Sequence, residues 1–152
     1  MSEEILTFTV DGRYFAIPLE NIQRVINSVE VTIIPDLQEN ILGIVKIHSE
    51  IYPVFNFRKK LGLPEKDISI DDHFIIAKTT LINIIIIADK VLSVSTYDKQ
   101  DLTVLKEYIY SNKEIKGVVS VNKDLTLIYD LETFLSRDEA NTLNDRLENI
   151  RE

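Results

Sequence analysis

Residues 41–63 read ILGIVKIHSEIYPVFNFRKKLGL and contain two apolar runs separated by a short polar break. The runs cover residues 41–47 and 51–57 and are rich in Ile, Val and aromatic side chains. Two such runs on either side of a short break predict a β-hairpin. Because nearly every position is apolar, we expect both faces of the strands to be covered, as in a small closed barrel.

Residues that end or cap secondary structure lie in and after the second run. Pro53 has no backbone N–H and is expected at an edge strand or a strand entrance. Asn56 can cap a short helical turn, in which Arg58 belongs to a charged face. Gly62 is expected to end that turn.

Other stretches also have the composition of β-strands, so the fold is predicted to be mainly β. Residues 5–10 and 13–17 flank an Asp-Gly turn signal and form a second predicted hairpin. The remaining predicted strands are residues 29–34, 73–78, 81–88, 89–94, 114–121 and 125–129.

Helical segments are predicted at residues 19–25, 101–108 and 136–151. In the last of these, Ser136 and Glu139 have the spacing of a capping box. Its narrow apolar stripe consists of Leu143, Leu147 and Ile150. We expect the stripe to pack against the rest of the protein rather than to bind a partner.

The composition excludes several classes of function. The chain has 152 residues, with 17 basic and 25 acidic side chains and a net charge of -8. This acidity argues against nucleic acid or an anionic membrane as the main partner. Without cysteine, no disulfide or thiolate site can form. No stretch resembles a signal peptide or a membrane span, so we expect a cytoplasmic protein without membrane insertion.

Candidate catalytic or metal-binding groups are scarce. His48 and His73 lie far apart in the sequence, and neither has further ligands at metal-site spacing. Asp71, Asp72 and His73 could form half a metal site, but a solvated acidic loop is the favoured interpretation. The four glycines are isolated, so no phosphate-binding loop is predicted. We expect no enzyme activity, metal or cofactor, and instead a binding module.

The chain contains a loose internal echo. Gly43 starts a strand that leads to Asn56, and Gly117 starts one that leads to Asp130. Each Asn or Asp comes directly after a strand and before Phe or Leu. Duplication and a chance likeness between hairpins both remain open.

The central hairpin resembles the signature of CheW-like domains. The matching residues are Gly43, Ile44, Ile51, Pro53, Val54, Asn56, Phe57, Arg58, Leu61, Gly62 and Leu63. The resemblance continues through Phe8, Tyr14, Ala16, Ile17, Asp89, Lys90, Val91, Gly117, Ile128, Asp130 and Leu131. It implies two small five-stranded SH3-like β-barrels packed side by side, with short helical turns and a C-terminal helix at about residues 136–151. It further implies one CheW-like domain over residues 1–152, whose second lobe, roughly residues 40–90, is interleaved with the first.

The resemblance implies a non-enzymatic chemotaxis adaptor. Its expected partners are the regulatory domain of a CheA-like histidine kinase, the cytoplasmic tip of a methyl-accepting chemoreceptor and other CheW-like domains. The implied partner-binding residues are Ile22, Arg24 and Val25 on the early helical turn, and Ile47, His48, Ser49 and Val91. The implied structural residues are Gly43, Pro53, Asn56, Arg58, Gly62, Asp89, Gly117 and Asp130. For each apolar binding residue, an ordinary core position is an equally open interpretation.

The chain departs from the family pattern at several of these positions. Arg24 stands where Glu is frequent, and His48-Ser49 stands where Arg-Gly is usual. Such changes leave unmatched charge on a partner, and Ser49 would be strained if the turn required a positive φ. Asn56 replaces Asp, which is expected to change little because both residues cap helices well. These departures indicate a divergent member with a dedicated partner or a lost contact, and neutral drift remains open.

Three alternative functions remain. A scaffold of another chemosensory-type pathway would share the fold. A small-ligand or enzyme domain would show a concave pocket with converging carboxylates or histidines. A structural dimer would show concentration-dependent sedimentation.

Overall fold

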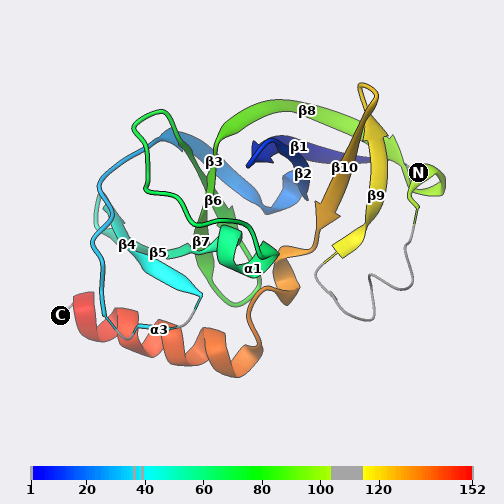
Figure 1. Ribbon diagram of the computed structural model, residues 1–152. Helices are drawn as coiled ribbons and strands as arrows, with labels where there is room; N and C mark the ends of the chain where they lie inside the picture. The colour runs from blue at the N-terminus through cyan, green and yellow to red at the C-terminus, as the bar shows by residue number, and fades with distance from the viewer. Residues whose placement is uncertain (1, 36, 39, 104–114, 152) are drawn as a thin grey trace. The chain divides into compact units, whose positions relative to one another are not determined.

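The computed structural model describes residues 2–35, 37, 38, 40–103 and 115–151 (Figure 1). The chain forms two compact units, each assembled from two separate segments. Unit 1 comprises residues 1–22 and 88–134, and unit 2 comprises residues 23–87 and 135–152. Most of the predicted second lobe, roughly residues 40–90, therefore lies in unit 2, which also includes the C-terminal helix.

Unit 1 is built on a five-stranded sheet with the order β8-β1-β2-β10-β9. The strands are β1 (Ser2–Val10), β2 (Arg13–Pro18), β8 (Lys90–Asp98), β9 (Ile115–Val121) and β10 (Asp124–Tyr129). The short 3₁₀ helices η1 (Leu19–Asn21), η2 (Lys99–Asp101) and η3 (Leu131–Thr133) follow β2, β8 and β10. Strands β2 and β10 pair in parallel, whereas β1–β2 and β9–β10 are antiparallel hairpins.

Unit 2 has a sheet with the order β3-β6-β7-β5-β4. The strands are β3 (Ile22–Asn27), β4 (Ile41–Ile47), β5 (Glu50–Phe55), β6 (His73–Lys78) and β7 (Asn83–Ala88). Helix α1 (Phe57–Leu61) follows β5, and helix α3 (Arg137–Arg151) belongs to the same unit. The predicted mainly β fold and central hairpin are confirmed, whereas two closed barrels stay a prediction because the strand order of each sheet leaves two end strands.

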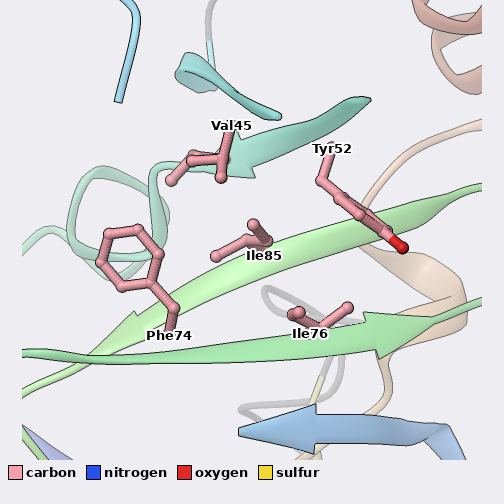
Figure 2. Close-up of a cluster of buried hydrophobic side chains, with 6 residues drawn as sticks. Val45, Tyr52, Phe74, Ile76 and Ile85 are labelled. Atoms are coloured by element: carbon pink, nitrogen blue, oxygen red, sulfur yellow. The ribbon is translucent and has the colours of Figure 1, made fainter. Parts of the chain in front are cut away.

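Each unit has its own apolar core. Figure 2 shows Val45, Tyr52, Phe74, Ile76 and Ile85 of unit 2, whose side chains point toward one another from β4, β5, β6 and β7. The corresponding cluster of unit 1 contains Ile5, Ala16, Tyr97, Val119 and Ile128. Consecutive buried positions in β5, β6 and β7 show that both faces of these strands are covered, as predicted for the central hairpin.

The C-terminal helix packs on unit 2, as predicted. Ser136 Oγ accepts a hydrogen bond from the Glu139 N–H at 3.1 Å, and Glu139 Oε1 accepts from the Ser136 N–H at 3.0 Å. This is the predicted capping box. Leu143 and Leu147 of the predicted stripe are buried, whereas its third member, Ile150, is 38% exposed. Asn144 Nδ2 donates to the Leu81 carbonyl at 3.0 Å.

The hairpins β4–β5 and β9–β10 match residue by residue. Gly43 pairs with Val54 next to a bulge, and Gly117 pairs with Ile128 next to a bulge. The β5 strand pairs in parallel with β7, just as β10 pairs with β2. The internal echo in the sequence therefore corresponds to the same local structure in both units.

Two predicted elements are wrong. Residues 19–25 are helical only in η1, after which the chain continues as β3, because the β-branched residues Ile22, Val25 and Ile26 suit an extended strand. Residues 29–34 form no strand and contribute only an isolated bridge between Thr32 and Ile44. The helix predicted at 101–108 lies outside the described residues beyond position 103.

Candidate partner-binding surface

The acidic motif before β6 forms a turn. The Asp72 carboxylate is buried and accepts a hydrogen bond from the Ser69 N–H at 2.8 Å. Lys66 Nζ lies 3.5 Å from the same carboxylate. Within the described ranges, no group of three or more His, Cys, Asp or Glu residues could hold a metal ion. Asp72 therefore stabilises the connection into β6.

A cleft of about 260 Å³ lies in unit 2 beside α3. Its lining residues are Glu50, Ile51, Tyr52, Thr79, Thr80, Leu81, Ile82, Asn83, Asn144 and Leu147. Glu50 supplies the one carboxylate in this lining, which is otherwise made of amides, hydroxyls and aliphatic groups. The cleft therefore offers hydrogen bonds but no acid–base pair.

The first group of predicted binding residues lies on β3 rather than on a helix. Side chains alternate along a strand, so Ile22 and Arg24 share one face and Val25 lies on the other. A helix would have placed Ile22 and Val25 together. Arg24 is exposed and Val25 is 37% exposed, whereas Ile22 is half-buried.

The second group lies at the β4–β5 turn. Ile47 is half-buried and packs against the core of unit 2, so it has a structural role there. His48 and Ser49 are exposed, and His48 has a φ of 58°. The prediction that Ser49 is strained is wrong, because the positive φ falls on His48 and not on Ser49.

Val91 lies on β8 in unit 1 and is half-buried. Its neighbours Leu92 and Val94 are more exposed, at 46% and 52%. Their exposure places accessible apolar side chains on β8. They were missed from sequence, where the available signal was the apolar residues Val91, Leu92 and Val94 within one predicted strand.

Gly43 and Gly117 lie where another segment crosses the hairpin. A Cβ on Gly43 would collide with the Thr32 carbonyl oxygen, and one on Gly117 would lie 2.8 Å from the Thr103 carbonyl oxygen. In each unit the residue after the glycine exchanges two 2.9 Å backbone hydrogen bonds with that threonine. Both glycines are therefore needed for close backbone approach.

The other signature residues organise the chain after the strands. Asn56 Oδ1 accepts from the Lys59 N–H at 3.1 Å, and Gly62 ends α1 with a φ of 71°. Arg58 Nη1 donates to the Pro64 carbonyl at 3.0 Å. Pro53 pairs with Ile44, and the pairing of β5 with β7 begins only at the next residue, so the missing N–H is tolerated.

Asp89 and Asp130 also accept backbone hydrogen bonds. Asp89 Oδ2 accepts from the Asp11 N–H at 2.8 Å, which ties the β1–β2 turn to the start of β8. Asp130 Oδ1 accepts from the Glu132 N–H at 3.1 Å and caps η3. Both carboxylates have a structural role in unit 1.

One phenol in unit 1 has a shifted pKa. Burial of Tyr97, together with the Glu3 carboxylate that accepts its hydrogen bond at 2.7 Å, raises the pKa of Tyr97 above its ordinary value. Lys116 Nζ lies 3.9 Å from the other Glu3 oxygen. The phenol is thus held neutral as part of the β1–β8 pair.

A surface groove in unit 2 was also missed from sequence. It has a volume of about 360 Å³ and lies between the segment after β3 and the loop before β6. Its lining residues are Ser28, Val29, Glu30, Val31, Ile33, Ile68, Ser69 and Ile70. The available signal was the pair Ile68 and Ile70, two large apolar residues in an otherwise polar loop.

The family model and the related proteins that match this chain all belong to one family. A family model described as CheW-like domain matches residues 4–139. The chain is 28% identical over 138 residues to the chemotaxis protein CheW of Thermotoga maritima, with 87% of each protein covered. It is 24% identical over 140 residues to the chemotaxis protein CheW of Bacillus subtilis, covering 91% of this chain and 90% of that protein.

The fold is similar to that of a solved structure. The crystal structure of the scaffolding protein TtCheW from Thermoanaerobacter tengcongensis superposes with a TM-score of 0.76 at 22% identity, covering 86% of each chain. Among the described residues, no helix is long and apolar enough to span a bilayer. With its family match over most of its length, the chain belongs to the CheW-like domain family.

Proposed function

We propose that this protein is a cytoplasmic chemotaxis adaptor that couples a CheA-type histidine kinase to the tips of methyl-accepting chemoreceptors. The observation that carries the proposal is the family match over residues 4–139, together with relatives that are chemotaxis CheW proteins. The function requires accessible apolar and charged side chains on a rigid β scaffold and no reactive groups.

We also propose that residues 1–152 act as one domain whose two sheets complete small SH3-like barrels. The isolated bridges Thr32–Ile44 and Thr103–Val118 support this, because each joins a segment beyond one end strand to the opposite end strand. The bridges would close the sheets where Gly43 and Gly117 permit backbone contact.

The proposed partner-binding residues are Ile22, Arg24, Val25, Ile47, His48, Ser49 and Val91. Exposure of Arg24, Val25, His48 and Ser49 supports their role, whereas Ile47 also supports the core. Arg24 is the best probe because its exposed charge can be reversed without disturbing buried groups.

The proposal is tested by measuring binding to the regulatory domain of the kinase and, separately, to a receptor-tip fragment from the same source. Arg24→Glu is expected to change affinity for at least one partner by about tenfold, the usual scale for an interfacial charge. Exposed Leu125, on β10, provides the control variant Leu125→Ser. A folded wild-type protein that binds neither partner would overturn the proposal.

A further inference from the structure

The groove of unit 2 presents apolar side chains to solvent in an ordered setting. Ile33 is 63% exposed, Ile70 is 91% exposed, and Val29 and Ile68 are also accessible. A large aliphatic side chain that is almost fully exposed gains nothing for folding. Several of them around one groove indicate a surface that is covered by something else.

Backbone hydrogen bonds hold both walls of the groove. The Ser28 N–H donates to the Asp72 carbonyl at 3.2 Å and joins the two walls, and Thr32 is fixed to Ile44 by two bonds of 2.9 Å. The turn that carries Ile70 is closed by the buried Asp72 carboxylate and by the Ser69 hydroxyl, which accepts from the Asp71 N–H at 3.1 Å. Ile70 is thus presented by a rigid turn, which lowers the entropic cost of binding.

The charges around the groove select the class of occupant. Glu30 is the one charged residue of its lining, and exposed Asp67 and Asp71 flank the Ile68–Ile70 stretch. The nearby cation, Lys66, lies beside the Asp72 carboxylate. Nucleic acid and anionic lipid would be repelled, and a second copy of a chain of net charge -8 would also bring like charge.

We propose that this groove docks an apolar segment of a partner protein whose exposed Ile, Leu, Val or aromatic side chains are flanked by Lys or Arg. The apolar residues would fill the space between Ile33 and Ile70, and the cation would pair with Glu30 or Asp71. This inference rests on the proposed adaptor function, and it assigns a docking surface distinct from the β3 and β4–β5 residues.

The test uses the full chain with the same two probes, the kinase regulatory domain and the receptor-tip fragment. Ile70→Asp and Ile33→Asp are expected to weaken binding to one of them by about tenfold or more, as for central interface residues. Glu30→Lys is expected to weaken the same interaction and to reduce its dependence on salt concentration. Leu125→Asp, an exposed apolar position on β10, is the matched control and is expected to leave both affinities unchanged.

Each other outcome counts against the groove. Wild-type affinity for both probes in all three folded groove variants would overturn this inference while leaving the adaptor function intact. Failure of the wild-type protein to bind either probe would overturn the adaptor function and the inference with it. A wild-type dimer in sedimentation that Ile70→Asp converts to a monomer would identify a second copy as the occupant and overturn the inference.

Discussion

The hairpins β4–β5 of unit 2 and β9–β10 of unit 1 share a backbone and differ in their turns. In both, a glycine follows a bulge and allows the backbone of a crossing segment to approach closely, at Thr32 in one unit and at Thr103 in the other. The turn residues are His48-Ser49 in unit 2 and Asn122-Lys123 in unit 1. Both Asn122 and Lys123 have positive φ, whereas only His48 does in the first turn.

The side chains inside the two hairpins also differ. Tyr52 pairs with Val45 in unit 2, and Thr126 pairs with Val119 at the same place in unit 1. All four residues are buried, so the two cores contain side chains of different size at equivalent positions of the paired strands. The close backbone crossing therefore constrains the sequence strictly, whereas the turn and the packing partners can diverge.

The largest expected effect comes from a charge at the residue paired with the hairpin glycine. Val54 and Ile128 occupy this place and are fully buried. Val54→Asp and Ile128→Asp each bury a carboxylate without a partner, which costs several kcal/mol and is expected to unfold the chain. Far-UV circular dichroism checks this, and a native spectrum for either variant would contradict the equivalence of the two cores.

The next effect is expected at the glycines themselves. Gly43→Ala forces the added methyl onto the Thr32 carbonyl and is expected to cost about 3 kcal/mol. Gly117→Ala has slightly more space and is expected to cost about 2 kcal/mol. Urea denaturation measures both, and a wild-type unfolding midpoint for Gly43→Ala would refute the crossing as a constraint.

The caps after the two hairpins are expected to contribute about equally. Asn56→Ala and Asp130→Ala each remove a side-chain acceptor from a backbone N–H and are expected to cost about 1 kcal/mol. Thermal unfolding of the two variants provides the measurement. A negligible loss in only one of them would show that the caps are not equivalent.

Asn56→Asp tests whether the neighbouring Glu65 disfavours a negatively charged cap at this position. Asn56 Nδ2 lies 3.4 Å from Glu65 Oε1, so a carboxylate at this position would face another carboxylate. We expect a loss of about 0.5 kcal/mol by like-charge repulsion, and its disappearance in a Glu65→Gln background. A double-mutant cycle at neutral pH tests this, and no coupling between the two positions would contradict it.

An equally small effect, of opposite sign, is expected at the turn. His48→Gly removes the strain of a positive φ, which stabilises the fold, but it also increases the entropy of the unfolded chain, which destabilises it. We expect a net increase of about 0.5 kcal/mol in the free energy of unfolding. Lys123→Gly is expected to behave in the same way in unit 1. Ser49→Gly is the matched control. If Ser49→Gly stabilises the protein and His48→Gly does not, the strained residue is Ser49 and the prediction is contradicted.

Features that depend on local contacts were predicted from the sequence, and features that depend on distant segments were not. Capping residues such as Asn56 and Ser136 were found because one side chain bonds its own local backbone. The helix predicted at residues 19–25 failed because its apolar spacing also fits a strand, and pairing with β6 decides between them. The groove around Ile33 and Ile70 joins segments distant in sequence, so a local pattern could indicate only the wall that carries Ile68 and Ile70.

Local periodicity and residue types at short spacing were enough to predict the mainly β class, the central hairpin, the capped C-terminal helix and the family. The three-dimensional structure was needed to show that Gly43 and Gly117 serve equivalent crossings, one in each unit, that the positive φ falls on His48, and that Arg24 lies on β3. The two crossings and the pairing of β3 depend on which distant segment approaches the backbone, whereas the φ of His48 follows from the register of the β4–β5 hairpin. That approach is set by packing, and local sequence preference does not specify it.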